Sequence, residues 1–237
     1  MDGPGTITWE EFLADAEDLV RLSDEISDRW ELRGDKTLPG RAYLARRTKT
    51  FVSSDFLVDE RADEFESIVP EPTSDPFEAT SVVQRPLVTE HHVLWSMSYG
   101  VPLLYFNAWK SDFAGVNPVS VEAAQKLVPQ GSLGYGELSQ AMHPIQDQPF
   151  MYLHPCRTRE LLQITHKSKN KLVSWLSAIA PAALYLKTRP EYYELTLGQG
   201  RRQSAAGHED SGNSDKDDED SDKKDRCEFH HREDTRR

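Results

Sequence analysis

The chain has 237 residues, of which 37% are hydrophobic, and its formal net charge is −12. A chain of this length can bury one sizeable core, and its charge disfavours nucleic acid and anionic membranes as ligands, because both require clustered lysine and arginine. It holds two cysteines, too few for a disulfide framework. No secretory leader and no membrane span of roughly 18 apolar residues is recognised. The composition predicts a cytoplasmic protein whose cysteines stay reduced.

The first predicted element is an amphipathic helix that begins at Thr8. Thr8 and Glu11 have the spacing of a capping box, and apolar residues then recur every three or four positions as far as Trp30. The outer face of this helix is acidic. A turn signal at Pro39-Gly40, followed by the strand pattern of residues 41–52, predicts a first hairpin.

Two segments have compositions that do not favour regular structure. Residues 59–90 hold nine acidic residues, two arginines and four prolines, so they are predicted to be a mostly irregular acidic insertion. Residues 198–237 are rich in Ser, Gly, Asp and Lys and have almost nothing to bury, which predicts a disordered tail. The folded domain is therefore predicted to be residues 1–197.

Strand patterns return after the acidic segment. Residues 92–99 alternate at period two, and one face of this predicted strand carries Val93, Trp95, Met97 and Tyr99. Gly100 interrupts the pattern, and residues 102–106 then form an apolar run. The two segments predict the centre of the sheet.

Helical patterns dominate the rest of the ordered region. Ser120 is placed to cap a short helix that runs through Val128, and a glycine-rich loop follows at residues 131–136. After Cys156, apolar residues at helical spacing predict two helices, the second of which ends at Pro181. A helix, strands, a cysteine-containing loop and further helices make an α+β layout with a mostly antiparallel sheet. We expect four of the five tryptophans to lie in its core, namely Trp9, Trp30, Trp95 and Trp175.

The most informative short stretch is His154-Pro155-Cys156, at the end of an apolar run. A residue before proline is pushed away from helical angles, so His154 is predicted to be extended and Pro155 to stiffen the approach to the cysteine. The thiol of Cys156 is then expected at a strand-to-helix junction. There a helix N-terminus and the charges of Arg157 and Arg159 would favour the nucleophilic thiolate.

Other interpretations stay open on the residues alone. A lone cysteine is often an inert, buried small hydrophobe. In a cysteine hydrolase, His143 or His154 would deprotonate Cys156, although no family signature for such an enzyme is present.

The remaining histidines and the second cysteine suggest no site. The pairs His91-His92 and His230-His231 lack the accompanying cysteines or carboxylates of a closed metal site, so no metal is predicted. Cys227 lies in the charged tail and is interpreted as a dispensable thiol.

Three segments together resemble the autophagy-related protein ten family, and they occur in that family's order. They are HVLWSMSYGVPLLYF at residues 92–106, HPIQDQPFMYLHPCRT at residues 143–158, and LVSWLSAIAPAALYL at residues 172–186. The sister family, autophagy-related protein three, conjugates a lipid-destined ubiquitin-like protein and shares His154-Pro155-Cys156. The SWLS pattern of residues 174–177 favours the ten family over its sister.

The resemblance implies a ubiquitin-conjugating-enzyme-like fold and a thioester-forming cysteine. Cys156 would receive the ubiquitin-like autophagy protein twelve from the activating enzyme, autophagy protein seven, and pass it to a lysine of autophagy protein five. No cofactor is implied, because ATP is used by the activating enzyme. His154, Pro155 and Thr158 would give local support. A catalytically inactive binding module of the same fold is the competing interpretation.

The resemblance leaves the oxyanion-stabilising group open. Ordinary conjugating enzymes use the asparagine of a His-Pro-Asn motif, whereas His143-Pro144 is followed here by Ile145. Asn107 and a backbone N–H are the candidates. Conjugating enzymes commonly present their first helix to the activating enzyme, so its acidic face, including Asp15 and Asp18, is expected to meet a basic groove.

Overall fold

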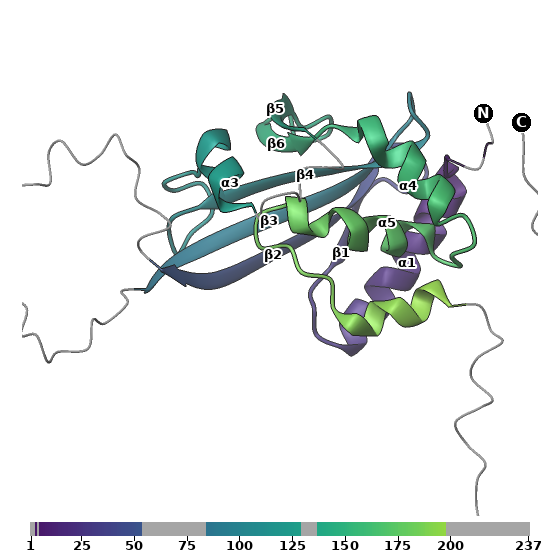
Figure 1. The fold of residues 1–237 in the computed structure, drawn as a ribbon, viewed down its shortest axis with the longest axis horizontal. Helices are drawn as coiled ribbons and strands as arrows, with labels where there is room; N and C mark the ends of the chain where they lie inside the picture. Colours follow the sequence, from purple (N-terminus) through teal and green to yellow (C-terminus); the bar gives the residue numbers. More distant parts are fainter. Residues whose placement is uncertain (1–2, 4, 54–83, 129–136, 198–237) are drawn as a thin grey trace, which may run out of the picture. The chain divides into compact units, whose positions relative to one another are not determined.

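A six-stranded antiparallel sheet, with the order β1-β2-β3-β4-β6-β5, is the centre of the structure (Figure 1). The computed structural model describes residues 3, 5–53, 84–128 and 137–197. The strands are β1 (Glu31–Gly34), β2 (Ala42–Ser53), β3 (Gln84–Ser96), β4 (Val101–Trp109), β5 (Leu138–Met142) and β6 (Pro149–Leu153). β1 and β5 form the two edges of the sheet.

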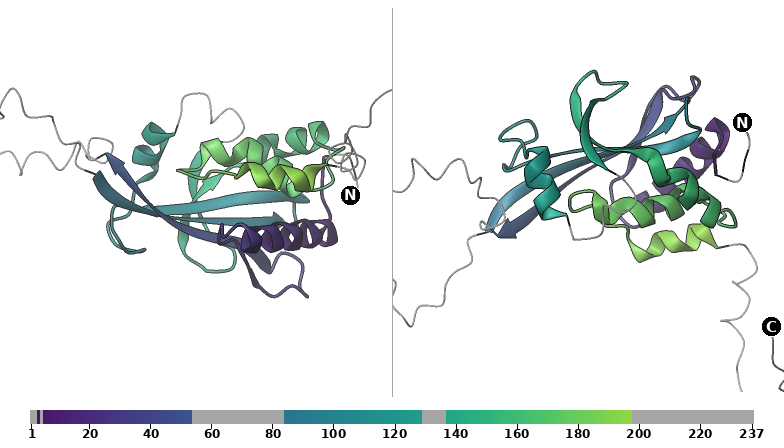
Figure 2. Two further views of the ribbon diagram at one scale, coloured as in Figure 1. Left: turned by 90° about the horizontal axis from the view of Figure 1, so that it is seen from below. Right: turned by 45° about the horizontal axis from the view of Figure 1, so that its top comes forward.

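Helices flank the sheet, which confirms the predicted α+β architecture. The α-helices are α1 (Trp9–Glu25), α3 (Val121–Leu127), α4 (Thr158–Ile164) and α5 (Lys171–Ile179), and the 3-10 helices are η3 (Pro155–Arg157), η4 (Ala180–Ala182) and η5 (Pro190–Thr196). α1, α5 and η5 pack against one another on one side of the long strands, whereas the β5–β6 hairpin curves away from them (Figures 1 and 2). Among the described residues, no helix is both long and apolar enough to cross a membrane.

The predicted first helix is confirmed at its start and ends earlier than predicted. The Thr8 hydroxyl accepts the Glu11 N–H at 3.1 Å, and the Glu11 carboxylate accepts the Thr8 N–H at 2.8 Å, so the capping box is complete. The helix ends at Glu25 rather than Trp30, because the buried Ser23 hydroxyl accepts the Trp30 N–H at 2.8 Å and turns the chain back. The short Ser120-capped helix is also confirmed.

The core lies between the sheet and the helices. Leu44, Val93 and Leu104 are paired in register on the face that the helices cover, and all three are fully buried. Ala45, His92 and Tyr105 are the corresponding residues on the opposite face. Because side chains alternate along a strand, each central strand contributes to both faces.

Four tryptophans were predicted to lie in the core, and most of them do. Trp9, Trp30 and Trp175 are buried. Trp95 is partly buried, and its indole N–H donates to the Ile7 carbonyl oxygen at 2.9 Å. This bond ties the residues before α1 to β3.

The C-terminal boundary predicted for the acidic insertion, residue 90, was wrong, because β3 begins at Gln84. Residues 84–90 therefore belong to the sheet and pair with β2. Pro86, which was taken as a loop signal, lies at a position where, among the described strands, β3 pairs with β2 alone, since pairing with β4 begins at Val88. A strand with a free side tolerates a residue that has no N–H. Residues 59–83 and the predicted tail, residues 198–237, lie outside the described residues.

The strand predicted over residues 92–99 was wrong at its end. β3 stops at Ser96, and Met97 and Tyr99 are 69% and 54% exposed in the turn that follows. The Gly100 N–H donates to the Ser96 carbonyl at 2.8 Å, with a φ of +61° at Gly100. Glycine adopts this left-handed backbone without strain, so the chain turns here instead of continuing as a strand.

Candidate active site

Cys156 lies in η3, between the end of β6 and the start of α4, which is the predicted strand-to-helix junction. Its thiol is exposed and donates a weak hydrogen bond to the His154 carbonyl oxygen at 3.8 Å. His154 has φ −62° and ψ 130°, so its predicted extended conformation is confirmed. An exposed thiol on a rigid turn is accessible to a reactant, which does not fit the inert core interpretation.

The predicted support residues are divided between the thiol's surroundings and the scaffold. His154 is exposed, and its N–H donates to the Glu137 carbonyl at 2.9 Å. Pro155 is buried beneath the turn. The buried Thr158 hydroxyl accepts the indole N–H of Trp175 at 3.3 Å, which ties α4 to α5. Pro155 and Thr158 therefore anchor the turn from below, whereas His154 flanks the thiol.

The positive charge predicted beside the thiol is partly neutralised. Arg157 forms an ion pair with Glu160, with a nitrogen–oxygen distance of 3.2 Å. Arg159 packs against Gly5, where an added Cβ would lie 2.8 Å from the Arg159 carbonyl oxygen. The close approach at Gly5 lets the N-terminal segment pass directly over α4.

Tyr152 is a candidate that the sequence analysis did not single out. Burial raises the pKa of Tyr152, and neighbouring Tyr105, Tyr99 and Cys156 raise it further. Its ring lies 4.8 Å from that of Tyr105 and 6.2 Å from that of His154, measured between centroids. Its hydroxyl therefore stays protonated at neutral pH and is a hydrogen-bond donor near the thiol.

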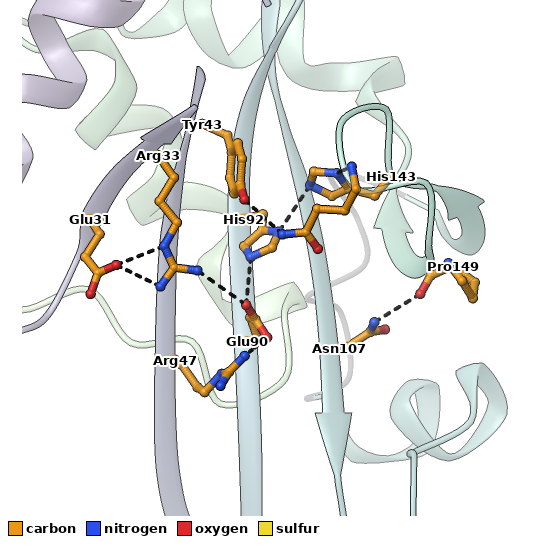
Figure 3. Close-up of polar contacts among 10 residues, drawn as sticks. Glu31, Arg33, Tyr43, Arg47, Glu90, His92, Asn107, His143 and Pro149 are labelled. Carbon is orange, nitrogen blue, oxygen red and sulfur yellow. Dashed lines mark hydrogen bonds and ion pairs between the residues drawn. The ribbon is translucent and has the colours of Figure 1, made fainter. Parts of the chain in front are cut away.

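The structure does not bring Asn107 to the thiol. The register pairs Leu104 with Leu153, so Asn107 lies about 10 Å further along β4, toward the start of β6 and away from Cys156. Its amide donates to the Pro149 carbonyl at 3.0 Å (Figure 3). The oxygen of the same amide accepts the Met151 N–H at 3.4 Å. Asn107 thus bridges β4 and β6 where their backbone pairing has stopped.

A buried chain of polar groups lies on the sheet face opposite the helices. His92 contacts the Glu90 carboxylate at 3.0 Å and His143 at 3.1 Å (Figure 3), and both histidines are fully buried. Burial lowers the pKa of His143 to about 4. Although burial alone would raise the pKa of Glu90, hydrogen bonds from His92 and Arg47 lower it to about 2. At neutral pH, Glu90 is therefore ionised and His143 is uncharged.

This chain removes His143 from the cysteine hydrolase alternative. The Nδ1 atom of His143 accepts the backbone N–H groups of Ile145 and Gln146 at 3.3 and 3.1 Å, and its Nε2 atom meets His92. Both ring nitrogens are occupied, so His143 has no free nitrogen with which to deprotonate Cys156.

His91-His92, the histidine pair that the structure describes, is divided between the two faces of the sheet. His91 lies on the opposite face from His92, where its Nε2 atom donates to the Leu184 carbonyl oxygen at 3.0 Å. In the part of the chain that the structure describes, no group of three or more His, Cys, Asp or Glu residues is arranged to hold a metal ion. His230-His231 and Cys227 lie outside that part.

The acidic face of α1 differs from the expectation at Asp15. Asp15 is only 9% exposed, because its carboxylate accepts the Leu172 N–H at 3.0 Å at the start of α5. The Asn170 side chain donates to the Asp15 carbonyl oxygen at 2.9 Å. Asp18 is partly exposed and forms an ion pair with Arg21. Asp15 therefore joins two helices, whereas Asp18 remains available to a partner.

Comparison with known proteins identifies the family. The family model described as "Autophagocytosis associated protein, active-site domain" matches residues 11–187, which include Cys156. The chain is 34% identical to the ubiquitin-like-conjugating enzyme ATG10 of Homo sapiens over 117 residues, which are 43% of this chain and 51% of the relative. It is 29% identical to the ATG10 enzyme of Arabidopsis thaliana over 106 residues, 38% of this chain and 46% of the relative.

The chain spans about half the length of the curated relatives that it matches. A solved structure, described as that of the autophagic E2 Atg10, aligns with a TM-score of 0.45 and 13% identity, covering 77% of this chain and 99% of the other. The family model, in contrast, covers most of the chain. The chain therefore belongs to the autophagocytosis-associated protein family, and the predicted membership of the autophagy-related protein ten (ATG10) group is confirmed.

Proposed function

We propose that this protein is a ubiquitin-like-conjugating enzyme that carries its cargo as a thioester on Cys156. The observation that carries the proposal is the exposed thiol at the β6–α4 junction, within the region that the active-site-domain model matches. The names of the ATG10 relatives support the same activity. The cargo is the ubiquitin-like autophagy protein twelve, and the acceptor is a lysine of autophagy protein five.

The reaction has two acyl-transfer steps. In the first, the Cys156 thiolate attacks the thioester carbonyl carbon on the activating enzyme, autophagy protein seven, whose own thiolate leaves. In the second, the lysine amine attacks the same carbonyl carbon, an amide bond forms, the amine gives up a proton to solvent, and the Cys156 thiolate leaves. ATP is consumed earlier, by the activating enzyme, so this chain needs no cofactor. The cytoplasm keeps the thiol reduced between cycles.

The surroundings of the thiol suit this chemistry. An exposed thiol leaves room for two large partners in succession, and the buried Pro155 and Thr158 keep the turn rigid beneath it. Each step passes through a tetrahedral intermediate whose oxyanion needs a hydrogen-bond donor. The hydroxyl of Tyr152, whose ring lies 6.2 Å from that of His154, is our candidate donor for such a bond, whereas both the oxygen and the nitrogen of the Asn107 amide are engaged on β6.

A charging assay tests the proposal. The purified protein is mixed with the activating enzyme, the cargo protein and ATP, and the products are separated with and without a thiol reductant. We expect an adduct that the reductant removes, and we expect Cys156→Ala to lose it while Cys227→Ser keeps it. An inactive binding module would bind the cargo without any reducible adduct. Charging by the lipid-destined ubiquitin-like protein instead would assign the chain to the sister activity.

A further inference from the structure

The β5–β6 hairpin leads into Cys156, and its backbone pairing with the rest of the sheet is short. β6 pairs with β4 at only three positions, from Leu104–Leu153 to Phe106–Met151, whereas it pairs with β5 at five. Strands with few ladder hydrogen bonds open more readily than long ones. The hairpin therefore depends on side chains for the rest of its attachment.

One such attachment joins the turn of the hairpin to β3. We call Glu90, His92 and His143 the histidine clasp, which Figure 3 shows extending from the turn toward β2. His143 lies at the start of the turn, where its N–H donates to the Gln148 carbonyl at 2.8 Å. The clasp is reinforced by the Gln146 amide, which donates to the Tyr43 hydroxyl at 2.9 Å. The turn is thus held over β4, β3 and β2 together.

The hydrogen bonds of the clasp have one consistent direction. Since two backbone N–H groups donate to the Nδ1 atom of His143, that atom carries no proton, and the ring's proton is on Nε2. This Nε2–H donates to the Nδ1 atom of His92. His92 therefore carries its own proton on Nε2, and this Nε2–H donates to the Glu90 carboxylate. Each ring has a single neutral tautomer that satisfies every partner.

The far end of the clasp is a fixed acceptor. Glu90 is 7% exposed, and its carboxylate accepts from Arg47 at 2.8 Å and lies 3.9 Å from the guanidinium of Arg33. A buried donor that loses its partner costs free energy, because water cannot replace the lost bond. Removing the middle member, His92, would leave the Nε2–H of His143 without its acceptor and would remove one of the donors to Glu90.

We propose that His92 and His143 are positioning residues for the thioester chemistry, which hold β6, and through it Cys156, at a fixed place relative to the sheet. The proposal rests on the proposed function. Neither ring contacts the thiol. Both act through the backbone of β6, which ends three residues before Cys156. Asn107 supplements them by bridging β4 to the start of the same strand.

The first test uses the unmodified protein. Nitrogen-15 NMR of the imidazole rings at pH 7 reports which ring nitrogen carries the proton. We expect both His92 and His143 to be neutral, with the proton on Nε2. A proton on Nδ1 of either ring, or a charged ring, would break the directed chain and overturn the proposal. This measurement does not require any partner protein or activity.

The second test compares three variants by amide hydrogen exchange and by charging rate. His92→Phe keeps ring packing against Tyr43 and Phe150 but removes both hydrogen bonds. We expect amide exchange in the β5–β6 turn and in β6 to become about tenfold faster, as for the loss of the one hydrogen bond that joins His143 to β3, and charging to slow. His92→Gln, whose amide can accept from His143 and donate to Glu90, should restore both. His91→Phe is the matched control on the same strand and should not loosen the hairpin selectively.

The two tests separate this proposal from the proposed function. If the unmodified protein is not charged, the proposed function fails, while the ring tautomers and the exchange rates still decide whether the clasp holds the hairpin. If His92→Phe loosens the hairpin but charging proceeds at the normal rate, the positioning role is wrong. Equal loosening by His91→Phe and His92→Phe would also overturn it, because the effect would then be general destabilisation.

Discussion

Replacing Asp15 by asparagine should remove a specific pH dependence of folding stability. Burial raises the pKa of Asp15 to about 6 from an ordinary value of 3.8, although the backbone N–H groups of Leu172 and Lys171 favour its charged form. Between these two values the folded state binds more protons at Asp15 than the unfolded state does. The contribution of Asp15 to stability is therefore fully present below about pH 4 and is lost as the pH rises through about 6.

The size of the effect follows from the two pKa values. The difference between 3.8 and about 6 corresponds to about 3 kcal/mol of unfolding free energy at most. Asp15→Asn keeps an oxygen that can accept the Leu172 N–H and cannot ionise. We expect the stability difference between the unmodified protein and this variant to change by about 2 to 3 kcal/mol, in favour of the variant, as the pH rises from 4 to 7.

Urea unfolding followed by tryptophan fluorescence at several pH values measures this difference. Asp18→Asn is the matched control for replacing a carboxylate by an amide on the same helix, because Asp18 lies one turn further along α1 and its side chain is 43% exposed. A stability difference for Asp15→Asn that stays constant from pH 4 to 7 would refute the reasoning. It would show that the hydrogen bonds from α5 stabilise the charged form of Asp15 in the folded protein as well as water does in the unfolded chain.

Three further substitutions probe the scaffold and the site. Trp175→Ala should cost about 3 to 5 kcal/mol of unfolding free energy, because a fully buried ring and its bond to Thr158 are lost together; a cost below 1 kcal/mol in urea titrations would contradict this packing. Gly5→Ala should lower the melting temperature by several degrees in calorimetry, because the new methyl group would collide with the Arg159 backbone, and an unchanged melting temperature would argue against the close approach. Tyr152→Phe should charge with cargo but transfer it to the acceptor lysine about a hundredfold more slowly in single-turnover assays; normal transfer would exclude its hydroxyl as the oxyanion donor.

Features that depend on neighbouring residues could be predicted from the sequence. The capping box of Thr8 and Glu11 and the extended His154 before Pro155 rest on short-range sterics and hydrogen bonds, and the structure has both. The junction that exposes Cys156 follows from the same local pattern. The order of helix, strands and helices was also readable, because periodicity changes at each boundary.

Features that depend on strand register could not be predicted in this way. His92 and His143 are separated by 51 residues in the chain and meet because the hairpin turn folds back over β3. The alternation of side chains along the strand did place His92 on the face opposite Val93. The neighbouring residues in the sequence gave no indication of which segment covers that face. Asn107 was proposed for chemistry because of its residue type, whereas the pairing of β4 with β6 places it at the other end of the strand.

Trapping the acyl-enzyme on Cys156→Ser tests the central claim most directly. Serine can attack the activated cargo, but its oxyester is a poorer acyl donor to amines than a thioester. With the activating enzyme, cargo and ATP, mass spectrometry should find the cargo's C-terminal glycine joined to residue 156. The ester should resist thiol reductants and be hydrolysed by mild alkali. The cargo should not be transferred to the acceptor. A linkage at any other residue, or continued transfer to the acceptor by Cys156→Ala, would contradict the account.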